Sequence, residues 1–160
     1  MHEEIGRRAL DVFRAEADAV PSMTLRGGAA VDSYDAPAAY EPDTDQPTDA
    51  YLERHAFWGL GYLDAASWRH YLPRLIDYAL RHAGEGGSLV VEGVLSSLRP
   101  PDRTPPRLAS ISAAQEAVVV AFLDVLAFDE GSAYRNFAMQ VLEEYWVPKA
   151  LYRKGPADGS

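Results

Sequence analysis

The segment Leu63–His82 is the sequence feature that most constrains the fold, because its apolar side chains follow the period of a helix. They recur three and four positions apart, at Trp68, Tyr71, Leu72, Leu75, Ile76, Ala79 and Leu80. This spacing predicts an amphipathic helix with one face in a protein core. Pro73 lies inside the pattern and removes one backbone hydrogen bond. Because the stripe keeps its phase across the proline, we expect one kinked helix or two collinear pieces.

Other segments show weaker helical patterns, some with capping residues at their starts. They cover residues 3–19, 48–57, 88–98, 112–128 and 132–146. Ser112–Gln115 fits the capping box that opens helices, and Asp64, Thr48 and Ser88 are candidate N-caps. Residues 88–98 also fit a strand, but no second convincing strand exists to pair with it. The patterns predict a single all-α domain of five or six helices over residues 1–154, with a flexible tail at 155–160. Any β-structure is expected near Thr24–Leu25 or Leu89–Val91.

A long loop is predicted between the first and second helices. Gly27-Gly28 has the composition of a turn, and residues 29–49 contain three prolines and no helical period. Long structureless loops inside compact domains are uncommon, and many of them carry function.

The charge balance restricts the classes of partner. The net charge is −9 and the pI is about 4.8, which disfavours binding to nucleic acid or to an anionic membrane. The chain contains no cysteine, so thiolate metal sites and thiol nucleophiles are excluded. The longest apolar run, Ala117–Leu123, is far shorter than a membrane span. The N-terminus lacks the pattern of a secretory signal, and we expect a cytoplasmic protein.

The strongest candidate for a functional surface is the acidic stretch between Arg26 and Arg54, which contains no basic residue. Such a surface can steer and dock a basic protein. Its carboxylates are the predicted partner-binding residues: Asp32, Asp35, Glu41, Asp43, Asp45, Asp49 and Glu53. The alternative is a solvated loop without a partner, held by the connector arginines Arg99, Arg103 and Arg107.

Catalytic and metal chemistry have weaker signals. Asp43, Asp45 and Asp49 begin like a calcium loop, but the required Gly and the twelfth-position Glu are missing. The four histidines show no metal-ligand spacing, so no metal, cofactor or catalytic residue is predicted. A rival hypothesis is a small enzyme or a binder of small molecules or metals, with a pocket beneath the acidic loop near Tyr34, His55 and Trp58.

Three segments carry a family resemblance: Leu63–Pro73, Gln115–Leu123 and Leu142–Trp146. The first has the pattern Leu-Asp-x-x-Ser-Trp-x-x-Tyr-Leu-Pro. Together they resemble an uncharacterised family of small bacterial proteins, a domain of unknown function, over about residues 25–150. The resemblance implies no chemistry. Small acidic bacterial proteins of this kind include immunity proteins, which bind and neutralise toxins, and this association is one of size and charge. The leading hypothesis is therefore a non-enzymatic immunity or inhibitor protein that uses its acidic surface against a basic toxin or effector.

Overall fold

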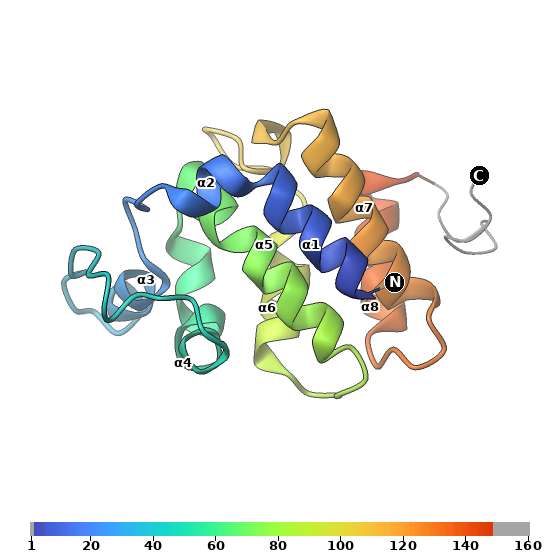
Figure 1. Ribbon diagram of the computed structural model, residues 1–160, viewed down its shortest axis with the longest axis horizontal. Coiled ribbons are helices and arrows are strands. Elements are labelled where there is room, and N and C mark those ends of the chain that lie inside the picture. Colours follow the sequence, from blue (N-terminus) through green and yellow to red (C-terminus); the bar gives the residue numbers. More distant parts are fainter. Residues whose placement is uncertain (1, 149–160) are drawn as a thin grey trace.

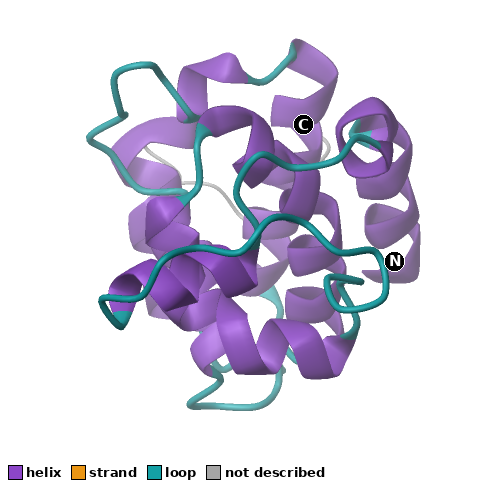
Figure 2. Cartoon of the chain, turned by 90° about the vertical axis from the view of Figure 1, so that its left-hand side faces the viewer, coloured by secondary structure: helices purple, strands orange, loops and turns teal. Residues whose placement is uncertain are grey.

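The computed structural model describes residues 2–148, and all regular structure in this range is helical (Figures 1 and 2). The α-helices are α1 (His2–Val12), α2 (Arg14–Asp18), α3 (Leu25–Asp32), α4 (Asp49–Gly59), α5 (Ala65–Arg81), α6 (Leu89–Ser97), α7 (Ala113–Phe128) and α8 (Arg135–Val141). Short 3-10 turns cover Leu60–Tyr62 and Leu108–Ser110, and a π-helical turn, Leu142–Trp146, continues α8. The predicted all-α class is confirmed. The predicted tail at 155–160 lies outside the described residues.

Helix α5 lies at the centre of the molecule, as its apolar stripe predicts. Eleven of its seventeen residues are buried, and Trp68, Tyr71 and Leu75 have no exposed surface. Helices α1, α2, α6 and α7 all contact it (Figure 1). The helix runs through Pro73 without interruption, and Asp64 caps its start by accepting a hydrogen bond from the Ser67 amide at 2.7 Å. Burial of large apolar side chains, each contributing about 1.5–3 kcal/mol, offsets the hydrogen bond that Pro73 removes.

The predicted N-caps are confirmed. Thr48 and Ser88 accept hydrogen bonds from the third amide of the helices they precede. Ser112 and Gln115 form the complete capping box, with the Ser112 amide donating to Gln115 Oε1 at 2.9 Å. The Gln115 side chain also donates to the Val12 carbonyl at 2.9 Å. The start of α7 is thereby joined to the end of α1.

The predicted count of five or six helices is too low, because residues 2–148 contain eight α-helices. The predicted helix over residues 3–19 divides into α1 and α2 at the buried Phe13, whose backbone leaves helical geometry at ψ 13°. The second addition is α3, which begins after the N-cap Thr24 and includes Gly27-Gly28, predicted as a turn. The acidic loop is therefore shorter, residues 33–48, and it joins α3 to α4. Both segments considered for β-structure are helical except for Thr24 itself.

Close packing between α3 and α4 explains the glycines that suggested turns. A Cβ atom added to Gly28 would lie 2.5 Å from the Gly59 carbonyl oxygen. A Cβ atom on Gly59 would overlap the Leu25 carbonyl oxygen. Gly59 itself has helical dihedral angles, φ −94° and ψ −26°. These two glycines are therefore needed because two backbones touch, and they supply no unusual backbone conformation.

None of the helices in the described range combines the length and the apolar character that crossing a membrane requires.

Substituting Gly28→Ala is expected to destabilise the fold by at least about 2 kcal/mol, because the new methyl group meets backbone that cannot rotate away. Urea denaturation measures the change. Gly61→Ala is the matched control, since a Cβ atom there has no neighbour within 4 Å, and its effect should stay within about 1 kcal/mol. Equal stabilities of the two variants would contradict the packing explanation.

Candidate functional site

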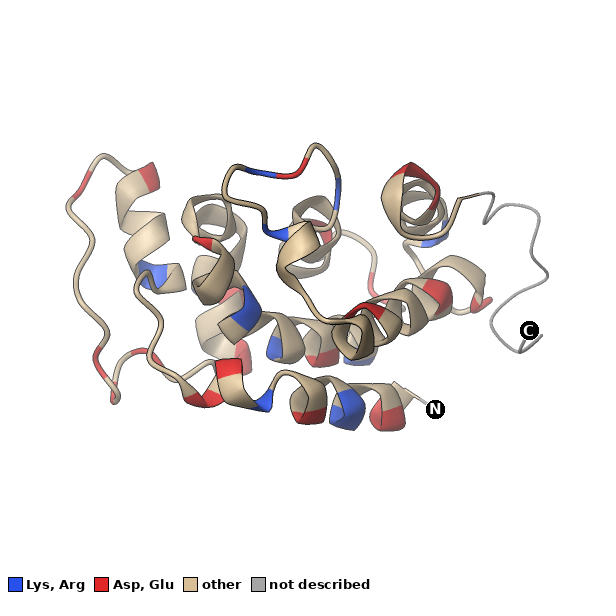
Figure 3. Cartoon of the chain, turned by 90° about the horizontal axis from the view of Figure 1, so that it is seen from above, with Lys and Arg blue, Asp and Glu red and all other residues tan. Residues whose placement is uncertain are grey.

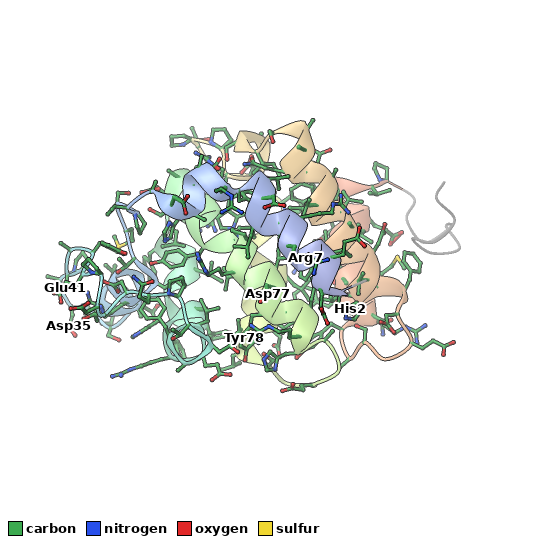
Figure 4. All side chains as sticks on the ribbon, viewed as in Figure 1. His2, Arg7, Asp35, Glu41, Asp77 and Tyr78 are labelled. Carbon is green, nitrogen blue, oxygen red and sulfur yellow. The ribbon has the colours of Figure 1, made fainter. Side chains whose placement is uncertain are left out.

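The predicted site residues gather at one end of the molecule, in what we call the acidic lobe, residues 32–53 (Figure 3). The lobe comprises the last residue of α3, the acidic loop and the first half of α4. Figure 4 shows Asp35 and Glu41 close to each other at its outer edge. Six of the seven carboxylates are exposed, whereas Asp45 is completely buried.

Asp45 is the internal anchor of the lobe. Its carboxylate accepts hydrogen bonds from Arg26 Nε at 3.0 Å and from Arg26 Nη2 at 2.8 Å. The Glu41 amide and the Tyr51 hydroxyl donate to it at 2.9 and 2.7 Å. Burial alone would raise the pKa of Asp45, but these hydrogen bonds outweigh it and hold the pKa below 3.8. Because the Asp45 carboxylate is buried and already accepts four hydrogen bonds, its role is to fix the acidic loop to α3 and α4.

Three other carboxylates have partners within the chain while remaining exposed. Asp49 forms a bidentate pair with Arg81 at 2.7 and 2.8 Å, and this contact lowers its pKa. Glu53 accepts from the Tyr78 hydroxyl at 2.7 Å. Asp32 accepts from the Tyr62 hydroxyl at 3.0 Å.

The arginines that hold the lobe are not the ones expected from the sequence. Arg26 and Arg81 hold it, whereas Arg99 forms a bidentate pair with Glu144. Arg103 donates to the carbonyls of Gly61 and Leu63. Arg107 is buried against an aromatic ring elsewhere.

The remaining carboxylates form the outward face of the lobe. Asp35, Glu41 and Asp43 are exposed, and no ion pair within residues 2–148 involves any of them. Unpaired surface carboxylates keep their full charge available to an approaching molecule. This face can therefore attract and hold cations of a partner.

Tyr34 directly precedes Asp35 in the acidic loop and is 99 % exposed. It occupies the position after the C-cap of α3, with φ 66°. The Tyr34 amide donates to the Val31 carbonyl and the Asp35 amide donates to the Ala30 carbonyl, at 2.9 and 2.8 Å. These two bonds define a Schellman motif, in which this position strongly favours glycine. A tyrosine here is held in a disfavoured backbone conformation and buries almost none of its own surface.

The rival hypothesis placed a pocket near Tyr34, His55 and Trp58, but these side chains do not enclose one. Tyr34 cannot wall a cavity because it is exposed. The His55 ring packs edge-on against Tyr51, with centroids 4.8 Å apart, and Trp58 packs against Phe57 at the same separation. Burial lowers the pKa of His55 and thereby favours its neutral form. Within the described range, no three His, Asp or Glu side chains are placed to hold a metal ion.

A second polar site lies in the connector between α6 and α7, residues 98–112, which contains the connector arginines. Asp102 accepts hydrogen bonds from the amides of Arg103, Arg107, Leu108 and Ala109, at 2.8–2.9 Å. This arrangement turns the chain so that Arg107 enters the body of the protein, where it is only 4 % exposed. Its guanidinium carbon lies 5.2 Å from the Trp68 ring centroid, and burial lowers its pKa to about 10. In the sequence, the available signal for this site was the grouping of Arg99, Arg103 and Arg107 around Asp102.

Comparison with known proteins identifies a family. A family model described as "Family of unknown function (DUF6714)" matches residues 1–150. The predicted membership of a family of unknown function is confirmed, and the match extends to the first residue. No curated protein and no solved structure matches the chain.

Substituting Asp45→Asn is expected to lower the free energy of unfolding at pH 7 by about 2–4 kcal/mol, because it leaves the partly buried Arg26 without its counter-charge. Urea denaturation measures this loss, and amide hydrogen exchange over residues 33–48 should accelerate. Asp43→Asn, an exposed change two residues away, should stay within about 0.5 kcal/mol.

The variant Asp45→Asn also tests how the stability contributed by Asp45 depends on pH. The folded pKa of Asp45 lies below 3.8, so its contribution to stability is complete well above pH 3.8 and is lost as the pH falls through and below that value. The stability gap between wild type and Asp45→Asn should therefore narrow in acid. A gap that stays constant from pH 7 to pH 3 would argue against the assigned anchor role.

Proposed function

The chain belongs to the DUF6714 family, a family of unknown function, and we propose that it is a non-enzymatic binding protein of the immunity or inhibitor type. It binds a basic protein toxin or effector through the outward face of the acidic lobe. The observation that carries this proposal is Tyr34, which is 99 % exposed in the same loop as three exposed carboxylates that form no ion pair within residues 2–148. A basic protein surface complements both features.

Electrostatics support the proposal in the first stage of binding. The net charge of −9 attracts a basic partner from a distance, and the lobe concentrates carboxylates at one end of the molecule (Figure 3). Charge complementarity of this kind raises association rates and weakens steeply with added salt. The ion pairs of Asp45 with Arg26 and of Asp49 with Arg81 hold the lobe in one conformation in the free protein. A preformed surface loses less conformational entropy on binding.

Tyr34 supports the proposal in the second stage. Tyrosine is among the residues most enriched at interface hot spots, because it buries a large area with few rotatable bonds and can also donate a hydrogen bond. In the free chain its ring has almost no contact to lose. Asp35, Glu41 and Asp43 would form the polar rim around this anchor, paired with Lys or Arg of the partner. Covering the partner's active site or substrate groove would neutralise it without any chemistry.

The partner is sought by co-purification of this chain with the products of neighbouring genes from its native host. A candidate partner must then lose its toxic or enzymatic activity when the purified complex forms. Affinity is measured by isothermal titration calorimetry at 50 and 300 mM salt, and binding through the acidic lobe requires a weaker complex at higher salt. A complex with no salt dependence, or a partner that stays active in the complex, contradicts the proposal.

Reversing two charges on the outward face, Asp35→Lys with Asp43→Lys, is expected to weaken partner binding at least tenfold, because it places like charges against the partner. Both residues are exposed and unpaired, so the melting temperature should not fall. Glu130→Lys is the matched control: this exposed residue lies in the connection between α7 and α8, at the opposite end of the molecule (Figure 1). Because the double variant reverses two charges and Glu130→Lys reverses one, equal losses of binding free energy per reversed charge would point to net charge alone and not to this face.

Replacing Tyr34→Gly separates binding from folding. Glycine suits the left-handed conformation at φ 66°, so the stability of the free chain should be unchanged within about 1 kcal/mol. Loss of a hot-spot side chain should weaken partner binding by roughly 30-fold, about 2 kcal/mol. An affinity equal to that of wild type would remove Tyr34 from the interface.

A further inference from the structure

The connector between α6 and α7 borders two adjoining hollows that are distinct from the acidic lobe. They have volumes of about 410 and 250 Å³ and share Ser96, Ser97, Arg103 and Arg107. We propose that Arg107 and Arg103 make this a binding site for a small organic oxyanion, a molecule that presents a carboxylate or phosphate group from an apolar body.

The first observation is the lack of partners at Arg107. Its Nε and Nη2 atoms are buried and make no hydrogen bond. The same Nε–Nη2 edge is used twice elsewhere in this chain, where Arg26 binds Asp45 and Arg99 binds Glu144 through two parallel hydrogen bonds. This edge matches the two oxygens of a carboxylate or phosphate. Arg107 therefore presents the geometry that binds oxyanions, without an oxyanion from residues 2–148.

The second observation is that the carboxylates nearest to Arg107 already accept hydrogen bonds from other groups. Asp102 accepts four backbone hydrogen bonds, and Asp64 caps α5. Asp102 and Asp64 act on Arg107 through their charge but form no direct ion pair with it. The contact with Trp68 is a cation–π interaction, which is weaker than charged hydrogen bonds and leaves the Nε–Nη2 edge unsatisfied. A buried cation whose N–H groups lack hydrogen-bond partners is costly, so an external anion that bonds to them would gain binding energy here.

The third observation is the second cation. The Arg103 guanidinium borders both hollows and is held in place by the Gly61 and Leu63 carbonyls, at 2.6 and 3.2 Å. Its positive charge also disfavours the charged form of Arg107. An anion near both side chains relieves this repulsion. Ser96 borders the same space and its hydroxyl can act as a further donor, whereas the Ser97 hydroxyl already donates to the Val94 carbonyl at 2.8 Å.

The walls of the hollows indicate the rest of the ligand. Phe57 and Leu60 border the smaller hollow, and Pro100, Pro101 and Leu108 border the larger one. Such walls favour an apolar or aromatic body over a highly hydrated one. The Arg107 Nε and Nη2 atoms are buried in this structure, so binding includes a side-chain rearrangement, for which the two hollows that Arg107 borders provide space.

The test uses three probes of similar size at constant ionic strength: benzoate, phenyl phosphate and neutral benzamide. Thermal shift and calorimetry measure binding, and the NMR signal of the Trp68 indole N–H, which donates to Ser97 Oγ, reports its location. At least one anion should bind and move this signal, whereas benzamide should do neither. Binding of benzoate alone identifies carboxylates as the ligand class, phenyl phosphate alone identifies phosphates, and both identify oxyanions in general. If neither anion binds, or benzamide binds equally, the proposal is overturned.

Variants of Arg107 complete the test. Arg107→Met should weaken anion binding at least tenfold, because charged hydrogen bonds are lost. The free protein should nevertheless be as stable as wild type or more stable, because a buried charge without an ion pair is removed. Arg107→Lys, which retains the charge without the two-nitrogen edge, should also bind at least severalfold more weakly. Arg135→Met is the matched control at an exposed arginine bordering a different hollow, and it should bind as wild type does. Equal binding by all three variants would overturn the proposal.

Discussion

Burial of α5 is the interaction on which the rest of the structure depends. Its side chains Trp68, Tyr71 and Leu75 have no exposed surface, and helices from both halves of the sequence pack around them. The hydrophobic effect is the dominant favourable contribution to folding, and here it is strong enough to keep Pro73 inside a continuous helix. Because α5 also contacts Leu25 through the Tyr71 hydroxyl, it supports α3. The acidic lobe is displayed from this rigid base.

Asp45 and Arg107 are both buried, but they differ in how their charged groups are hydrogen-bonded. Asp45 is buried with four hydrogen bonds, including a bidentate pair with Arg26, and such a group fixes local structure. Arg107 is buried with two nitrogen atoms unsatisfied. Both groups lose hydration on burial, but the Asp45 carboxylate regains hydrogen bonds within the described chain, whereas Arg107 Nε and Nη2 do not. This difference separates a structural anchor from a candidate ligand site, although both residues lie in segments without regular helical pattern.

Most of the helical architecture could be predicted from the sequence, because caps and apolar periodicity are local signals. The capping box at Ser112 and the cap at Asp64 were both identifiable from residue type and spacing. Helix α3 was not, because Gly27-Gly28 has the composition of a turn. Gly28 is required by contact with Gly59, about thirty residues later. A close approach of two backbones depends on tertiary packing, and no local rule distinguishes it from a turn.

For the candidate site, the sequence by itself determined the net charge, the concentration of carboxylates between Arg26 and Arg54, and the absence of cysteine chemistry. Only the tertiary structure decided which carboxylates face outward. It buried Asp45 and exposed Asp43, two residues apart, and it placed Arg107 over Trp68 with two nitrogen atoms that have no hydrogen-bond partner in the described residues. The physical reason is that residue type fixes a side chain's charge, whereas its availability depends on burial and hydrogen bonding. Both of these are set by residues distant in the chain that folding brings together.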